Sequence, residues 1–475
     1  MACLATAGRC RFAFWFLGAA LLCLPGSAQA EEPQAPGDPP PNYLRPALEI
    51  GAGLAAASLW YFIDDRNVLD WDYPSAKERF NGEAWRFDNN TFALNYVFHP
   101  LAGAGMYVLA RGNRMNVWPS FGYSLAGSTM WEYVIEFNEK VSINDMIVTP
   151  LSGLAIGEFF HKLALHVSDG SPLLGWTFGL SVHGHRELDG LGPVRQKLWN
   201  DLAFGYGFGV VEPAGGSRAL ATHVVGFEGR FVSLPGYRAP GRLGRWFHDA
   251  EFAAFELDLD LGANGPGVDS FAETLLVGYH FQDFPGLFAT GALGVAYQYR
   301  STEAFGFDDR QGLLLFPGFS SELGFKRGPW RAALELRAYP SFGSMSAPSY
   351  KLWREQIPEG RTKTVLQREG YSYGWGLFGQ GEARIGCGPF ELRAELVYGH
   401  FASIDGLDRA QEHVALDQPV VERPLDYSVS SWVTGLPVPL KLGATYEGRL
   451  RDSRMSGVER RVEGRRLLFE LVMPL

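Results

Sequence analysis

From Asp201 to the C-terminus, apolar and polar side chains alternate, and this pattern constrains the fold more than any other feature of the chain. A β-strand turns successive side chains to opposite faces, and a tilted strand of about ten residues crosses a bilayer. About twelve segments of this length follow one another. Examples of the apolar rows are Leu202, Phe204, Tyr206, Phe208 and Val210; Phe255, Leu257, Leu259 and Leu261; Leu392, Ala394, Leu396 and Tyr398; and Leu467, Phe469, Leu471 and Met473.

The opposite faces of these segments carry charge. Their ionised residues are Glu256, Asp258 and Asp260; Glu335 and Arg337; Glu391, Arg393 and Glu395; and Glu447 and Arg449. A charge that faces lipid at mid-depth costs about 2–4 kcal/mol, so this face must line a lumen or meet water. A soluble sandwich, with its apolar faces turned inward, is the alternative interpretation of the same alternation.

The connections between segments decide between these folds. Short turns at 283–286, 326–329, 387–388 and 435–439 alternate with longer links at 301–311, 344–370, 402–426 and 452–458. Short turns on one side and long loops on the other are typical of an outer-membrane barrel. The link at 234–249 departs from this register, because it should be short and is not. We therefore predict a mainly β fold, a transmembrane antiparallel barrel of about twelve strands over 201–475.

The N-terminus predicts export. Arg9 and Arg11 precede an apolar run that Pro25 breaks, and a small-residue cleavage pattern ends at Ala30, so 1–30 is expected to be a signal peptide. Its removal takes away two arginines and no acids, so the net charge of −10 becomes −12. This acidic balance excludes nucleic acid as an expected partner. Only Cys387 survives of the four cysteines, so no intrachain disulfide is expected.

Before the barrel, 31–43 is a proline-rich linker, 44–168 is a helical unit and 169–200 is a connector. The first helix, Pro46 to Ile63, has two interpretations, a membrane helix or a helix packed tightly on protein. We favour packing through Gly51, Ala55 and Ser58, because small residues at this spacing allow close helix contact. Further helices are predicted after a Ser75 cap, at 101–111, from Ser120 to about 136, and from a Ser142 cap through Pro150 to 161.

Polar residues in this helical unit form the candidate site. Arg111, Glu132, Glu136, Glu158 and His161 are expected to converge as a polar cluster. The first interpretation is structural, with paired buried charges. The second is a metal site at Glu158 and His161, a carboxylate–histidine spacing used in helical di-metal proteins, although the motif occurs once and we predict no metal or other cofactor. The third is catalysis. Its candidate residues are His99, Ser128, Glu132, Glu136 and Asp145.

Several sequence words of the helical unit resemble a known family. NYVFHPLAGAGMYVLAR, GSTMWEYVIE, SINDMIVTP and GLAIGEFFH are similar to the family of domain of unknown function 3943, and the likeness extends back toward Leu48. The resemblance implies an exported, outer-membrane protein of Gram-negative bacteria and supplies no catalytic role. The matching positions are His99, Pro100, Tyr107, Arg111, Trp131, Glu132, Glu136, Ser142, Asn144, Asp145, Gly153, Gly157 and Glu158.

The sequence therefore predicts an outer-membrane barrel with a helical plug or cap on the periplasmic side of the lumen. Its preferred function is non-enzymatic, in envelope structure, assembly or restricted transport. Expected partners are outer-membrane lipid and, during biogenesis, the barrel assembly machinery. The alternative is an outer-membrane enzyme that acts on lipid or glycan through the His/Glu/Asp cluster.

Overall fold

Long antiparallel strands make up the C-terminal part of the protein in the computed structural model, which describes residues 39–63, 73–88, 90–192, 198–216, 218–356, 365–404 and 419–475. The strands are β3 (Trp199–Glu212), β4 (Leu220–Val232), β5 (Gly241–Phe247), β6 (Phe252–Gly262), β7 (Gly265–Phe284), β8 (Leu287–Thr302), β9 (Asp309–Arg327), β10 (Trp330–Ser346), β11 (Tyr371–Cys387), β12 (Phe390–Ser403), β13 (Val420–Val433), β14 (Lys441–Met455) and β15 (Val458–Pro474).

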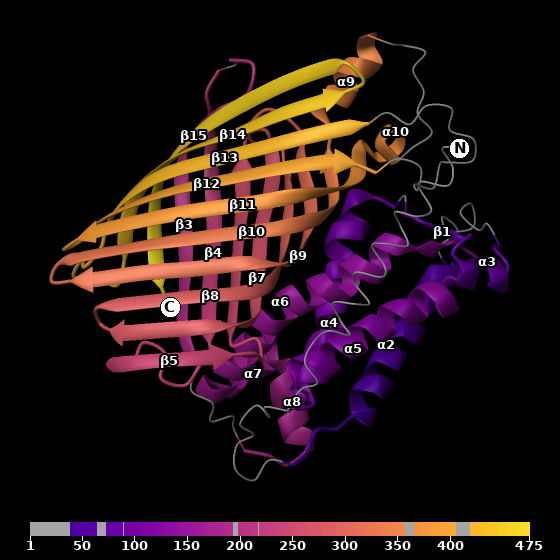
Figure 1. The fold of residues 1–475 in the computed structure, drawn as a ribbon, viewed down its shortest axis with the longest axis horizontal. Helices are drawn as coiled ribbons and strands as arrows, with labels where there is room; N and C mark the ends of the chain where they lie inside the picture. The colour runs from indigo at the N-terminus through magenta and orange to yellow at the C-terminus, as the bar shows by residue number, and fades with distance from the viewer. Residues whose placement is uncertain are drawn as a thin grey trace. The chain divides into compact units, whose positions relative to one another are not determined.

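The strands close into a barrel (Figure 1). They pair in the order β7-β6-β4-β3-β15-β14-β13-β12-β11-β10-β9-β8, and β8 pairs back onto β7. Among the described residues this gives a closed ring of twelve antiparallel strands, which confirms the predicted fold class. Closure leaves none of these twelve strands as a free edge along its whole length.

The long link at 234–249 holds an additional strand. β5 pairs with Gly278–Phe284 of β7, next to the stretch of β7 that pairs with β6. The link is therefore long because it adds a thirteenth strand, which extends the wall at the end where the short turns lie. A seven-residue strand after a polar turn carries too short an alternation to be recognised in the sequence.

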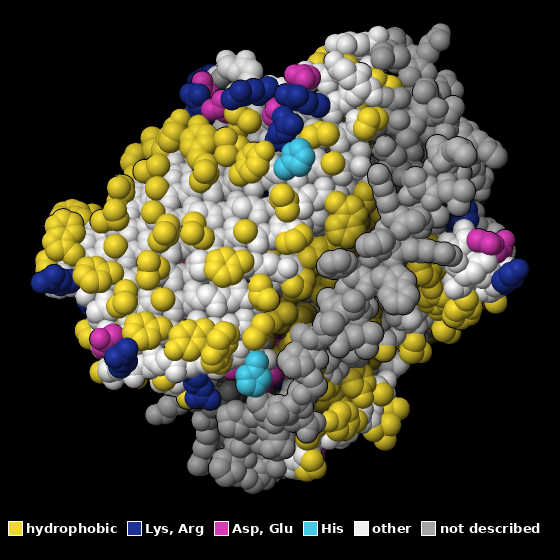
Figure 2. All heavy atoms as spheres, in the orientation of Figure 1, with side chains coloured by type: hydrophobic (Ala, Val, Ile, Leu, Met, Phe, Trp, Pro, Cys, Tyr) yellow, Lys and Arg dark blue, Asp and Glu magenta, His cyan; other side chains and the backbone are white. Residues whose placement is uncertain are grey.

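The two faces of the barrel differ in chemistry as the alternation predicts. Apolar side chains such as Phe204, Phe208, Leu396 and Phe469 are exposed on the outer wall. Figure 2 shows apolar side chains spread over this wall, with charged groups mainly at its ends. The charged rows turn into the lumen, where they contact one another. This arrangement rules out the sandwich, whose apolar faces would be buried against each other.

The N-terminal unit consists of helices and a two-stranded parallel ladder of β1 (Trp85–Arg86) and β2 (Val141–Ser142). The helices are α2 (Leu44–Ile63), α3 (Ala76–Asn81), η2 (Leu94–Phe98), α4 (His99–Gly112), α5 (Val117–Met130), η3 (Trp131–Ile135), α6 (Ile143–Gly170), α7 (Pro172–Phe178) and α8 (Leu180–Leu188). The predicted caps Ser75 and Ser142 are both present, since each side chain accepts a backbone N–H at the start of its helix. The other predicted helix ends are less accurate: α5 begins three residues before Ser120, and α6 continues nine residues past His161.

Glycines set the distance between α4 and α6. A Cβ on Gly103 would lie 1.9 Å from the carbonyl oxygen of Thr149, and a Cβ on Gly153 would lie 2.6 Å from the carbonyl carbon of Gly103. Real Cβ contacts are never this short, so any side chain at either position must separate the two helices. The helices touch through their backbones at this point.

The helical unit packs on the outer wall of the barrel. Phe159 of α6 packs on Phe231 and Phe255, whose side chains point outward from β4 and β6. At the other end of the contact, Asn95 donates hydrogen bonds of 3.2 and 2.8 Å to the hydroxyls of Tyr371 and Tyr373 on the outward face of β11. In between, α6 lies over β7 and β8 (Figure 1).

This position corrects the prediction that the helices plug or cap the lumen. The strand residues that the unit contacts include the outward-facing Thr274, Tyr297 and Phe342. The sequence showed that the helices carry apolar faces and buried charges, but both properties suit a unit inside the barrel and a unit against its outer wall equally well. The contacts of strand side chains within the lumen explain why no helix is needed there.

The predicted packing of the first helix is also wrong. Gly51 and Ala55 of α2 are exposed, and a Cβ on Gly51 would meet nothing within 4 Å. The helix rests on α4 and α5 through its other side, where Pro46, Ile50 and Tyr61 are buried. The helix therefore contacts its neighbours through Pro46, Ile50 and Tyr61 and not through the small residues Gly51 and Ala55.

The predicted signal peptide and its cleavage site lie within residues 1–38, as does most of the predicted linker at 31–43. Residues 1–38 are outside the described residues.

Candidate functional site

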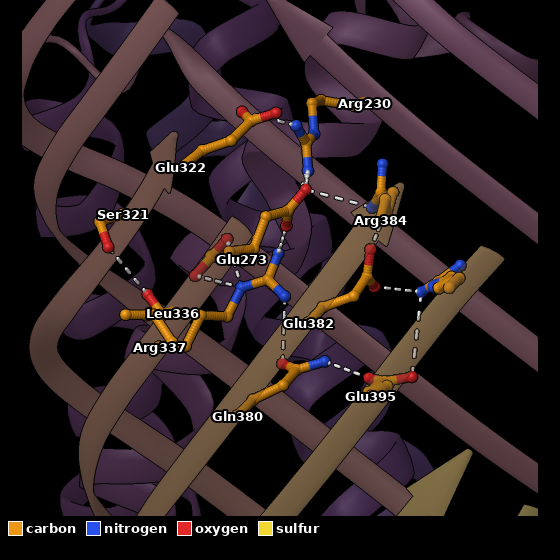
Figure 3. Close-up of polar contacts among 12 residues, drawn as sticks. Arg230, Glu273, Ser321, Glu322, Leu336, Arg337, Gln380, Glu382, Arg384 and Glu395 are labelled. Carbon is orange, nitrogen blue, oxygen red and sulfur yellow. Dashed lines mark hydrogen bonds and ion pairs between the residues drawn. The ribbon is translucent and has the colours of Figure 1, made fainter. Parts of the chain in front are cut away.

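An ion-pair network crosses the lumen nearest the short turns (Figure 3). Arg230 of β4 reaches Glu322 of β9 at 3.0 Å and Glu335 of β10 at 3.2 Å. Arg337 of β10 binds Glu335 at 3.2 Å and Glu273 of β7 at 3.1 Å. Three strands lie between β4 and β9 on the shorter way round the ring, so Arg230 spans the lumen.

The same network continues along β10, β11 and β12. Arg384 contacts Glu335 at 3.1 Å and also pairs with Glu382, which Arg393 contacts at 2.5 Å. Glu335 contacts three guanidinium groups and Glu382 contacts two. Buried charges are tolerated when they are paired and hydrogen-bonded, and this network meets that condition.

A second network crosses the lumen nearer the long loops. Arg300 of β8 binds Asp269 of β7 at 2.7 Å and Asp426 of β13 at 2.5 Å. Arg449 of β14 reaches Asp269 at 2.9 Å, and Arg451 of the same strand pairs with Asp309. Four strands separate β8 from β13, and four separate β14 from β7, so these pairs join nearly opposite walls.

Apolar and aromatic groups lie at both ends of the lumen. At the short-turn end, Tyr237 from the β4–β5 link packs on Phe252 and His280, and Arg238 lies 4.9 Å above the ring of Trp199. At the long-loop end, Phe305 from the β8–β9 link lies under the guanidinium of Arg449, at 4.8 Å.

A polar cavity of about 160 Å³ lies between the two networks. Its lining includes Glu256, Asp258, Arg300, Glu395 and Glu447. Its volume is enough for a few waters.

In the helical unit, the predicted polar residues form two separate clusters. The first is built on Glu158, whose carboxylate accepts from Arg111 Nε at 3.0 Å, from Arg111 Nη2 at 3.1 Å and from the Tyr107 hydroxyl at 2.7 Å. Lys162 Nζ lies 3.0 Å from the same carboxylate. The side chains of Arg111 and Glu158 are fully buried, so this pair is the charged centre of the α4–α6 contact.

The Glu158 cluster predicts acid sensitivity. Burial alone would raise the pKa of Glu158, but Arg111, Lys162 and His161 outweigh it and lower the pKa to about 2. A carboxyl whose pKa is depressed on folding stabilises the protein above its unfolded pKa of about 4.5, and this stabilisation is lost as the pH falls toward 2. The shift corresponds to about 3 kcal/mol.

We expect the urea concentration at the unfolding midpoint of the helical unit to decrease as the pH is lowered from 4.5 to 2. This decrease should be smaller in Glu158→Gln. A wild-type midpoint that is constant over this interval would contradict the assignment.

The second cluster surrounds the N-terminus of α6. Glu132 accepts the backbone N–H of Ser142 at 2.7 Å, and Ser128 donates to the carbonyl oxygen of Asp145 at 3.0 Å. His99 Nε2 lies 3.8 Å from the Asp145 carboxylate. Burial, followed by the charges of Glu136 and Asp145, raises the pKa of Glu132 well above its usual range.

Replacing Glu132 by glutamine is therefore expected to stabilise the protein above about pH 5. Glutamine keeps the acceptor for the Ser142 N–H and removes the cost of ionising a buried acid. The pKa of Glu132 is higher in the folded protein than in the unfolded chain, where it is about 4.5. Wild type therefore loses stability relative to the variant as the pH rises above about 4.5. Urea unfolding at pH 4 and pH 8 tests this: the difference should be present at pH 8 and small at pH 4. A variant that is less stable than wild type at pH 8 would show that Glu132 is held ionised by its surroundings.

The remaining candidates join one cluster or the other. Glu136 accepts the indole N–H of Trp131 at 2.8 Å, and burial raises its pKa. His161 is buried next to Glu158. Among the described residues, no group of three or more His, Cys, Asp or Glu side chains is placed to hold a metal ion. Glu158, the carboxylate of the metal interpretation, already binds two cationic groups.

The sequence interpretation missed Lys162 and Arg79. Lys162 follows Glu158 by four residues, a helical spacing that could have revealed it. Arg79 from α3 donates to the backbone carbonyl oxygens of Glu132, near the start of η3, and of Glu139, beyond its end. No local pattern relates Arg79 to residues more than fifty positions away.

Residues 84–182 match the family described as Domain of unknown function (DUF3943), which confirms the resemblance over that range. The matched range covers most of the helical unit and none of the barrel, and it begins after α2. No curated protein matches the chain.

Among solved structures, the chain is similar to the NanC porin, at 10% identity over 58% of this chain and 100% of that chain, with a TM-score of 0.24. It is also similar to another porin at 8% identity (58% and 100%; TM-score 0.21) and to the translocator domain of autotransporter NalP from Neisseria meningitidis at 12% identity (65% and 99%; TM-score 0.21).

Proposed function

We propose that this protein is an outer-membrane β-barrel whose lumen is closed by its own side chains, and that it serves as a non-conducting scaffold in envelope structure or assembly. The observation that carries this proposal is the pair of ion-pair networks that cross the lumen. As a scaffold, the barrel would hold the helical unit in place on its outer wall.

The lumen networks support a scaffold over a pore. A water-filled channel needs a continuous path, whereas Arg230, Arg300 and Arg449 each reach a carboxylate several strands away around the ring. Tyr237 and Phe305 add a closure at each end.

The outer wall supports the membrane location. An exposed apolar surface that continues around the barrel is far larger than soluble monomers tolerate. Its natural partner is lipid, and insertion would require the barrel assembly machinery. The expected signal peptide at 1–30 agrees with export.

The enzymatic alternative has weaker support. Ser128 and Glu132 are 4% and 1% exposed, so neither reaches a lipid or glycan from outside. The Ser128 hydroxyl donates to a backbone carbonyl and not to His99 or Glu132, which a nucleophile would need as a base.

Cell fractionation tests the proposal. The mature protein is expected in the outer membrane, with a gel mobility that changes on boiling, as folded barrels show. Phe469→Asp, which puts a charge on the outer wall of β15, should reduce membrane recovery, whereas the matched Phe469→Leu should not. Recovery of the wild-type protein as a free periplasmic species would overturn the proposal.

A further inference from the structure

The helix α2 is apolar, long and largely uncovered. Among the described helices it is the one that is long and apolar enough to cross a membrane. In its most apolar stretch of 18 residues, 17% is buried. Twenty residues of α-helix extend about 30 Å, which matches the hydrocarbon thickness of a bilayer. A core helix of a soluble protein would be mostly buried, and the expected signal peptide is a different segment.

The exposed arc of α2 is too wide for one protein partner. The three consecutive residues Gly51, Ala52 and Gly53 are all exposed. Successive helical residues are about 100° apart, so these positions span roughly 200° of the circumference. A single packed helix covers an apolar stripe of roughly half that width, whereas fluid hydrocarbon covers the whole arc.

The polar groups of α2 are placed as a lipid environment requires. At its N-terminal end, Arg45 pairs with Asp189, and Glu49 lies 2.8 Å from His185 Nε2. From there to Ile63 the helix carries no charged residue. The Ser58 hydroxyl donates to the Ala55 carbonyl oxygen at 2.8 Å within the helix itself. The hydroxyl of Tyr61 donates to Glu139 at 2.8 Å, toward the protein.

The rest of the helical unit continues this surface. Its exposed apolar side chains lie on α2, η2, α4, η3, α7 and α8. They include Leu59, Trp60, Phe98, Val134, Leu173 and Leu180. Figure 2 shows apolar side chains on the helical unit as well as on the barrel wall beside it. The unit occupies part of the same outer wall that the barrel turns to lipid, so the two apolar surfaces adjoin.

We infer that membrane lipid covers the helical unit, and that α2 lies with its exposed arc in the hydrocarbon alongside the barrel. This inference rests on the proposed membrane location. It places the residues matched at 84–182 in a unit that is docked on a barrel at the lipid boundary. The charged groups around Glu158 and Glu139 lie in the interior of this unit.

Spin-label accessibility tests the inference in the full mature protein. Cys387→Ser provides a cysteine-free background, and single cysteines then replace Leu59 on α2, Tyr446 on the outer wall of β14 and Glu459 at the β14–β15 turn. A second α2 position, Ala56→Cys, guards against a local disturbance at residue 59. The labelled proteins are reconstituted into phosphatidylethanolamine and phosphatidylglycerol vesicles, and collision with oxygen is compared with collision with a water-soluble nickel complex.

Labels at 59 and 56 are expected to behave like the label at 446, with high oxygen collision and loss of nickel collision, and unlike the label at 459. Nickel collision at 59 and 56 while 446 stays protected would overturn the inference and leave the barrel proposal intact. Nickel collision at 446 as well would overturn both. Spin–spin broadening at 59 that disappears on dilution with unlabelled protein would overturn lipid in favour of a second copy.

Discussion

Glu335→Ala is expected to destabilise the barrel by about 3–5 kcal/mol. The Glu335 carboxylate is 6% exposed and pairs with Arg230, Arg337 and Arg384, so its removal leaves three guanidinium groups in the lumen with fewer partners. The large cost comes from three cations in the lumen that each lose a carboxylate partner and keep one other, Glu322, Glu273 and Glu382 respectively. Urea unfolding of the refolded barrel in detergent micelles, followed by tryptophan fluorescence, measures the effect.

Glu391→Ala is the matched control. Glu391 of β12 pairs with Arg331 of β10 at 3.1 Å, but its side chain is 26% exposed and that of Arg331 is 37% exposed. A partly exposed pair of this kind is worth about 0–1 kcal/mol. Equal effects of the two substitutions would mean that water reaches both sites equally and that the lumen is open.

Arg111→Ala is expected to cost a similar 3–5 kcal/mol, confined to the helical unit. The substitution leaves Glu158 buried between α4 and α6 without its bidentate partner, although Lys162 stays 3.0 Å away. It also removes the donor to the Met115 carbonyl oxygen, which Arg111 Nη1 binds at 2.6 Å. Hydrogen exchange resolves where stability is lost, and protection should fall in α4 and α6 while the strands stay protected.

Arg465→Ala controls for the loss of an arginine. Arg465 contacts Glu463 at 3.1 Å, but its side chain is half exposed, so its replacement should leave stability nearly unchanged. If Arg111→Ala left the exchange of α4 and α6 unchanged, the Glu158 cluster would not be the centre of that contact.

The barrel could be predicted because its sequence signal is local and repeated. The alternation of Phe469 and Leu471 with their polar neighbours sets which face each residue takes, and twelve repeats average out single exceptions. The alternation of short turns and long loops then predicted that the strands close into a barrel and that their number is even. The β5 strand was missed because seven residues after a polar turn do not show an alternation that stands out.

The position of the helical unit could not be predicted because it depends on side chains from opposite ends of the chain. Asn95 bonds to Tyr371, and Phe159 packs on Phe231, yet nothing in either segment specifies the other. For the same reason the predicted polar cluster divides in two: Glu132 and Glu158 share helical spacing patterns, but η3 and α6 carry them to different places. The partners of Glu335 likewise come from three strands.

The conductance of the purified protein in a planar lipid bilayer tests the central claim most directly. With cross-lumen pairs from Arg230 and Arg300 in place, and Tyr237 and Phe305 at the two ends, insertion should produce no steady current steps at neutral pH and moderate voltage. Regular, long-lived open steps of the size that a water-filled porin gives would contradict a lumen closed by its own side chains.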